Sequence, residues 1–120
     1  MKGIYLLRIY LKKDKIISIG RLGRISFKKG YYVYVGSAMN NLERRIERHK
    51  SSKKKVHWHI DYFLRYGKII GVKKIITDKR AECKMSNKMM KMSDNLVKGF
   101  GCSDCRCQSH LYYFKERPLL

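Results

Sequence analysis

The strongest strand signal in the sequence is the segment at residues 31–36, YYVYVG, which a glycine also precedes. Aromatic and β-branched residues favour a strand, and glycines at both ends bound it. Residues 2–11 have a similar composition, and their alternation places apolar side chains on both faces. Two shorter strands are expected at residues 15–19 and 25–27, with a turn bounded by glycines between them. We therefore expect the first half of the chain to form an antiparallel meander.

The second half of the sequence alternates predicted helices with predicted strands. Asn40 or Asn41 can cap a helix in which Leu42 and Ile46 share one side. The remaining predicted elements are a helix at residues 57–66, a strand at 69–76, a helix from Asp78 to about Met92 with an apolar stripe of Ala81, Met85, Met89 and Met92, and a strand at 110–114. The pattern predicts an α/β (α+β) fold, a small antiparallel sheet flanked by helices, in one domain spanning residues 1–120.

The charge of the sequence points to a polyanionic partner. There are 29 Lys and Arg against 9 Asp and Glu, which gives a formal net charge of +20. A solvated lysine-rich surface usually balances its lysines with glutamates, so nucleic acid explains this excess better. A membrane partner is not expected, because no run of about 18 apolar residues and no basic amphipathic stretch occurs. The order of residues typical of a secretory signal is also absent, which predicts a cytoplasmic protein.

Several motifs follow one another in an order that is more specific than any of them alone. Residues 3–5 read GIY, residues 34–36 read YVG, Arg45 and His49 stand one helical turn apart, and Glu82 lies in a later predicted helix. This set resembles the signature of the GIY-YIG nucleases, with a volume-conserving valine for isoleucine in the second triplet. Wider segments resemble a stand-alone, single-domain branch of that superfamily whose function is not known.

The resemblance implies a three-stranded antiparallel sheet flanked by helices, and hydrolysis of a phosphodiester with one divalent metal ion. It implies that Tyr5 and Tyr34 lie side by side on neighbouring strands and that Glu82 binds Mg²⁺ or Mn²⁺. Arg45 would grip a phosphate oxygen with its planar set of donors. Tyr5 would orient or deprotonate the attacking water, although a phenol with a pKa of about 10 needs nearby cations to act as a base.

The histidines leave alternatives open. His49 shares a helix face with Arg45 and is a candidate for proton transfer or phosphate contact. His57 lies just after the loop that follows the basic helix, where some members of the superfamily have a functional histidine. Either His57 or His59 could instead cap a helix or contact a phosphate, and a structural part is favoured for His59.

A basic surface is predicted on the first helix and the loop after it. Its side chains would hold phosphates without reading bases; they are Arg44, Arg48, Lys50, Lys53, Lys54 and Lys55.

A cysteine-rich segment at residues 99–114 sets this sequence apart from the better-known GIY-YIG proteins. Cys102, Cys105, Cys107 and His110 offer enough ligands for a tetrahedral zinc, and Cys83 could approach from the third helix. Zinc sites in small domains usually use two separated ligand pairs, however, and here three thiols share one loop. Buried reduced thiols or an inducible disulfide are therefore the preferred alternatives.

The sequence leaves three hypotheses for the function. The first is a metal-dependent endonuclease, acting on DNA and specific for substrate shape, such as a branch, a flap or a damaged site in repair or recombination. The second is a non-catalytic nucleic-acid-binding protein with the same fold, which could be supported by zinc. The third is a zinc-supported partner of RNA or of the ribosome.

Overall fold

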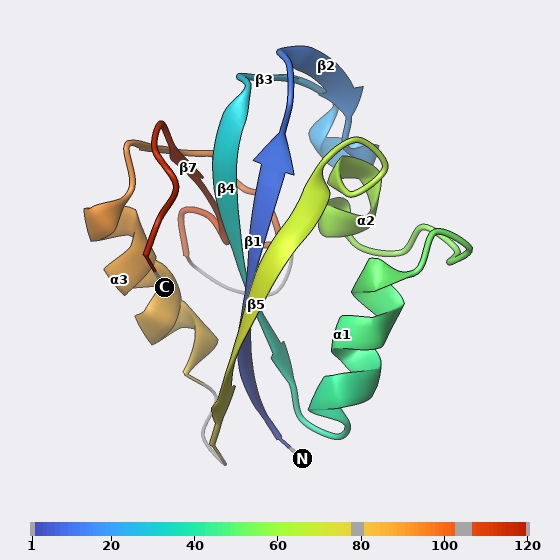
Figure 1. Cartoon of the computed structure of the whole chain (residues 1–120), viewed down its shortest axis with the longest axis vertical. Helices are drawn as coiled ribbons and strands as arrows, with labels where there is room; N and C mark the ends of the chain where they lie inside the picture. Colours follow the sequence, from blue (N-terminus) through green and yellow to red (C-terminus); the bar gives the residue numbers. More distant parts are fainter. Residues whose placement is uncertain (1, 78–80, 103–106, 120) are drawn as a thin grey trace.

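The centre of the fold is a pair of long antiparallel strands, β1 (Gly3–Leu11) and β4 (Gly30–Ala38), which pair along their whole length. They lie in a mixed α+β fold, seen in the computed structural model, which describes residues 2–77, 81–102 and 107–119 (Figure 1). The outer strands are β5 (Lys68–Ile76), β6 (Asn95–Leu96) and β7 (Leu111–Phe114), and the sheet order is β5-β1-β4-β7-β6. The sheet thus has five strands, not the three implied by the resemblance, because the C-terminal segment adds two.

The predicted meander is wrong. Strands β2 (Lys15–Ser18) and β3 (Arg24–Phe27) pair with each other in a separate two-stranded sheet, with the short 3₁₀ helix η1 (Gly20–Leu22) between them. This leaves β1 to pair with β4, which matches it in length. The hairpin packs its apolar residues Ile17 and Phe27 into the main core instead of extending the sheet.

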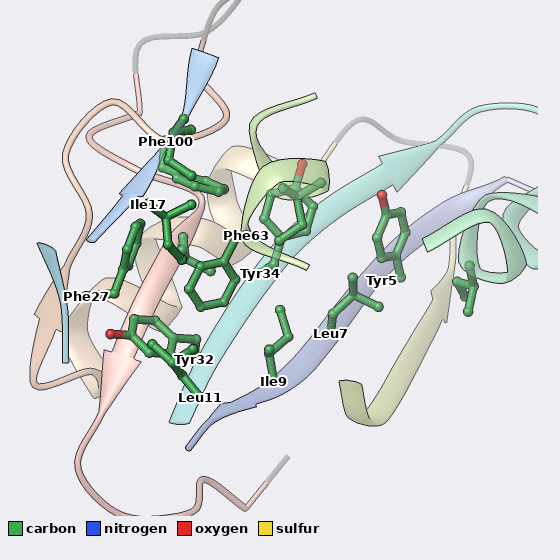
Figure 2. Packing of buried hydrophobic residues seen from close by; sticks show 14 of the residues in the cluster. Tyr5, Leu7, Ile9, Leu11, Ile17, Phe27, Tyr32, Tyr34, Phe63 and Phe100 are labelled. Atoms are coloured by element: carbon green, nitrogen blue, oxygen red, sulfur yellow. The ribbon is translucent and has the colours of Figure 1, made fainter. Parts of the chain in front are cut away.

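Helices cover both faces of the sheet. On one face lie α1 (Leu42–Lys50) and α2 (His59–Phe63), and α3 (Glu82–Met92) lies on the other, as Figure 1 shows. Alternate residues of β1 enter two separate clusters: Leu7 packs with Phe63, while Leu6 packs with Met89. Figure 2 shows the first cluster from close by. The expectation that β1 is apolar on both faces is therefore confirmed.

The helices differ from the predicted ones mainly at their ends. Asn41 caps α1, its side chain accepting a hydrogen bond from the backbone N–H of Arg44 at 3.0 Å. Helix α2 is shorter than the predicted residues 57–66. Helix α3 begins at Glu82, and the predicted cap Asp78 lies outside the described residues. Its predicted stripe is wrong at Met92, which is 52% exposed, because the buried line of the helix runs instead through Ser86 and Met89.

Two glycines allow the close approaches on which the sheet and its cleft depend. A Cβ atom on Gly3 would collide with the backbone carbonyl of Ile75 on the neighbouring strand β5. A Cβ atom on Gly36 would collide with the phenol end of Tyr5. The ring of Tyr5 therefore lies across β4 at a position where no other residue type leaves room.

Replacing Gly36 by alanine should destabilise the protein by about 1–3 kcal/mol, because the new methyl group must displace a buried ring. Urea unfolding measures the loss as a shift of the transition midpoint. The control is the same substitution in a Tyr5→Leu background, where the side chain is shorter and Gly36→Ala should cost less than half as much. An equal cost in both backgrounds would show that Gly36 does not serve to accommodate the Tyr5 ring.

Candidate active site

A cleft of about 530 Å³ brings together residues from seven separate segments of the chain. Its walls come from β1, η1, β4, α1, the start of α2, the start of α3 and the C-terminal segment at Gly101. Five of the six predicted catalytic residues line it, namely Tyr5, Tyr34, Arg45, His57 and Glu82. The sixth, His49, is buried directly behind Tyr5. The structure therefore gathers side chains that are up to 77 positions apart in the sequence, from Tyr5 to Glu82.

Tyr5 and His49 form a hydrogen-bonded pair at the back of the cleft. The Tyr5 hydroxyl lies 2.7 Å from Nε2 of His49. Burial raises the pKa of Tyr5 to about 12, although Arg45 acts in the opposite direction. Burial also lowers the pKa of His49 to about 4. Among the described residues, Nδ1 of this imidazole has no hydrogen-bond partner, so a charged imidazolium would have no acceptor for its Nδ1 proton. At neutral pH the pair therefore consists of a neutral phenol and a neutral imidazole.

Tyr34 stands beside Tyr5 on the neighbouring strand, as predicted. The two ring centroids are 6.4 Å apart, and the hydroxyl ends point to the same side of the sheet (Figure 2). Burial raises the pKa of Tyr34 well above its usual value, and the neighbouring Tyr5 adds to the effect. Tyr34 can thus donate a hydrogen bond at neutral pH but is a poor base.

Arg45 is held in place from two sides. Its Nη1 donates to the backbone carbonyl of Ser37 at 3.1 Å, and its guanidinium carbon lies 4.5 Å from the centroid of the Trp58 ring. A guanidinium held by one carbonyl and one aromatic face keeps other N–H donors for an anion in the cleft. Arg45 is therefore a preorganised cation at the wall of the cleft.

Glu82 lines the cleft beside the end of β4, beyond the residues of β4 that pair with β7. Strand β7 pairs with Tyr31 to Tyr34 of β4, so the last residues of β4 extend past it. There the hydroxyl of Ser37 donates to Oε2 of Glu82 at 2.9 Å. Among the described residues that line the cleft, Glu82 is the only acidic one. Ser37 thus connects the acid to Arg45, which binds the carbonyl of the same residue.

Asp61 is a structural residue that the sequence reasoning did not single out. This buried carboxylate accepts two hydrogen bonds of 3.0 Å from Arg48, and it also accepts from the backbone N–H groups of His57 and Trp58 at 2.8 and 2.9 Å. These bonds lower the pKa of Asp61 despite its burial. Its position in the first turn of α2, three residues after Trp58, is a capping signal that could have been recognised.

The predicted basic surface divides into structural and exposed side chains. Arg48 also donates to the carbonyl of Lys55 at 2.9 Å, so its guanidinium makes structural contacts within the protein. Lys54 donates to the carbonyls of His49 and Ser51 at 2.7 and 3.0 Å and thereby closes the end of α1. The exposed cations of the set are Arg44, Lys50, Lys53 and Lys55.

The two uncertain histidines both line the cleft and differ in exposure and contacts. His57 is exposed and lines the cleft, so it can reach a bound molecule. His59 accepts a hydrogen bond at Nδ1 from the backbone N–H of Gly101 at 2.9 Å, and burial lowers its pKa. His59 therefore has a structural contact that joins α2 to the C-terminal segment.

The cysteine-rich segment contributes to a second group of potential ligands, outside the cleft. The ligand atoms of Cys83, Cys107 and His110 all lie within 4.8 Å of one another, so these residues could hold a metal ion. Cys102 donates from Sγ to the carbonyl of Phe100 at 3.4 Å. Cys105 lies outside the described residues. The group therefore includes Cys83 of α3, which the sequence suggested only as an additional ligand.

Comparison with known proteins identifies the family of this chain. A family model described as "Domain of unknown function DUF123" matches residues 4–120. No curated protein and no solved structure matches the chain. Among the described helices, none is both long enough and apolar enough to cross a membrane.

The lowered pKa of His49 predicts how stability depends on pH. Between about pH 6.5 and pH 4 the unfolded chain binds a proton at this histidine that the folded chain does not. The free energy of unfolding should therefore decrease as the pH falls through this window, by up to about 3 kcal/mol. Urea unfolding at a series of pH values measures the slope.

The matched variants are His49→Gln and His57→Gln. The first removes the buried titrating group and should flatten the slope, whereas the second replaces an exposed histidine and should preserve it. A His49→Gln protein that loses stability with acid as steeply as the parent would contradict the assignment.

Proposed function

The chain belongs to the DUF123 family, whose function is unknown, and we propose from its cleft that it is a metal-dependent endonuclease that hydrolyses nucleic-acid phosphodiesters, with DNA as the substrate. One observation supports the proposal most strongly. The carboxylate of Glu82, the guanidinium of Arg45 and the phenol of Tyr5 line one cleft, and the Tyr5 hydroxyl is hydrogen-bonded to the imidazole of His49 behind it. Their order along the chain is the order that resembles the GIY-YIG nucleases. The cleft volume lies within the range of about 300–1,000 Å³ that is usual for ligand sites.

The charge of the molecule supports a nucleic-acid substrate. The net charge of +20 gives a long-range attraction for a polyanion, and exposed cations lie on α1, which also carries Arg45 of the cleft, and on the loop that leads to His57. Contacts of this kind neutralise phosphates and carry no base sequence information. We therefore propose that the substrate is selected by its shape, such as a branch, a flap or a damaged site.

Arg45 is the proposed phosphate clamp. The transition state of phosphodiester hydrolysis gathers negative charge on the nonbridging oxygens, and a fixed cation stabilises that charge without having to reorganise. The carbonyl of Ser37 and the ring of Trp58 fix the guanidinium in this way. A lysine at this position would lose the planar set of donors.

Glu82 is the proposed ligand of a divalent metal, Mg²⁺ or Mn²⁺. A single carboxylate beside a hydroxyl in an open cleft fits Mg²⁺, which keeps several waters and is usually held by one or two carboxylates together with substrate phosphates. When bound, such an ion supplies Lewis acidity at the scissile phosphate. Ser37 orients the carboxylate through its hydrogen bond to Oε2.

Tyr5 and His49 provide a route for the proton of the attacking water. With a pKa near 12, Tyr5 is not a phenolate at rest, so it cannot accept a proton unless it gives one up. The neutral imidazole 2.7 Å away can take that proton. As the water oxygen bonds to phosphorus, its proton passes to the Tyr5 oxygen and the Tyr5 proton passes to Nε2 of His49. The bond from phosphorus to the leaving oxygen breaks, and that oxygen takes a proton from solvent.

Replacing Glu82 by glutamine should reduce metal-dependent cleavage by at least about 100-fold, because a neutral amide of the same size binds a divalent ion poorly. Cleavage is measured with Mg²⁺ and with Mn²⁺ on labelled junctions, flaps, hairpins and single strands. Binding to the same substrates should be retained and should weaken steeply with salt, since the cationic surface is unchanged.

The matched control is Glu47→Gln, which changes charge equally at an exposed position on α1. It should cut like the parent. If Glu82→Gln cuts as fast as Glu47→Gln, the metal assignment is wrong. If the parent binds every substrate of the panel and cuts none with either ion, the chain is a nucleic-acid-binding protein that retains the fold without the reaction.

A further inference from the structure

A group of two thiols and an imidazole stands outside the cleft, at the junction of α3 with the C-terminal segment. It consists of Cys83, Cys107 and His110. We propose that these residues bind one zinc ion and that this ion fixes the start of α3, so that Glu82 is positioned in the cleft. The zinc site itself is independent of the nuclease proposal, and only its positioning of Glu82 rests on it.

The spacing of the ligand atoms fits a shared ion. In a tetrahedral site with Zn–S bonds of about 2.3 Å, two sulfurs are about 3.8 Å apart. The ligand atoms of the three residues all lie within 4.8 Å of one another, so a small closure is enough. Water can fill the fourth position.

The ligand types select the metal. Thiolate and imidazole favour zinc and disfavour Mg²⁺, which prefers oxygen. Binding releases the thiol protons of Cys83 and Cys107 to solvent, and the two thiolates then cancel the charge of the ion. A neutral assembly suits this place, because His110 is buried and both cysteines are partly buried. A strongly cationic protein can therefore hold this cation without adding to its net charge.

The ligand set is built on a rigid frame. The backbone N–H of His110 donates to the carbonyl of Phe100 at 2.9 Å, and its carbonyl accepts from the N–H of Val35 on β4 at 2.9 Å. One turn along α3 from Cys83, the hydroxyl of Ser86 donates to the carbonyl of Ser109 at 2.5 Å. The backbone of His110 is thus fixed to the sheet, and α3 already contacts the segment that carries this residue.

The consequence for the cleft follows from the chain itself. Cys83 is the residue after Glu82, and both lie in the first turn of α3. Residues 78–80, which precede this turn, are outside the described residues. An ion that binds Cys83 to the sheet-anchored His110 limits the movement of Glu82 toward and away from Arg45. The zinc site would therefore hold Glu82, the proposed oxygen ligand of Mg²⁺ or Mn²⁺, in position.

The test uses the full chain, purified under reducing conditions. Its zinc content should be close to one ion per chain, and replacement of zinc by Co²⁺ should give the near-ultraviolet absorption of cobalt–thiolate charge transfer. Cys83→Ser and Cys107→Ser should each weaken cobalt binding at least about tenfold. Lys84→Ser, an exposed change at the next position of α3, and Glu82→Gln should leave the spectrum unchanged.

Two results would overturn the zinc site: no cobalt–thiolate band in the reduced parent, or a band that persists undiminished in both cysteine variants. A disulfide between Cys83 and Cys107 that survives mild reduction would overturn it as well. Because these measurements need no nucleic acid, they remain valid if the chain cuts nothing.

Positioning of Glu82 is tested by hydrogen exchange of the α3 amides with and without zinc. Removal of zinc should speed exchange in the first turns of α3 at least about tenfold in the parent, with a parallel rise in the Mg²⁺ concentration needed for cleavage. Cys83→Ser should resemble the zinc-free parent, whereas Lys84→Ser should resemble the loaded one. Equal exchange in the loaded and zinc-free parent would overturn the positioning role and leave the zinc site in place.

Discussion

The candidate site depends on one close approach, the ring of Tyr5 lying across Gly36. Because position 36 has no side chain, the phenol can cross from β1 over β4 and bring its hydroxyl to Nε2 of His49. The same approach places Tyr5 beside Tyr34 and opposite the α1 face that carries Arg45. Without it, the phenol would have to turn away and the imidazole would lose its bonded partner. The contacts among β1, β4 and α1 at this site thus depend on the absence of a Cβ atom at position 36.

Burial keeps the two ionisable groups at the back of the cleft neutral. Burial raises the pKa of Tyr5 and lowers that of His49, so both are neutral at rest, even in a chain with a net charge of +20. Of the nearby cations, Arg48 is paired with Asp61, and Lys54 donates to helix-end carbonyls. Arg45 lies near Tyr5 and keeps donors for an anion, and Arg21 also lines the cleft. An anion that entered the cleft would therefore meet neutral groups at its back and cations at its walls.

The sequence predicted the elements better than their arrangement. Alternation identified β1 and β4, and Asn41 was one of the two expected caps of α1. The order of the sheet was missed, because pairing depends on which strands match in length and bury apolar faces together, and neighbours along the chain need not do so. The start of α3 and the burial of Ser86 were missed as well. Periodicity predicts apolar residues on a buried helix face, whereas Ser86 can lie there because it hydrogen-bonds to the carbonyl of Ser109.

By itself the sequence determined which chemical groups this protein has and their order along the chain: the glycines, the tyrosines, the basic helix, the later acid and the tail of cysteines. Propensity, alternation and capping are local properties, and they can be deduced from residues that are close in the sequence. Only the tertiary structure decided that Asp61 neutralises Arg48, that Cys83 approaches His110, and that Tyr5 and His49 share a hydrogen bond without charge. Those outcomes depend on long-range proximity and on the removal of water, which exist only once the chain has folded.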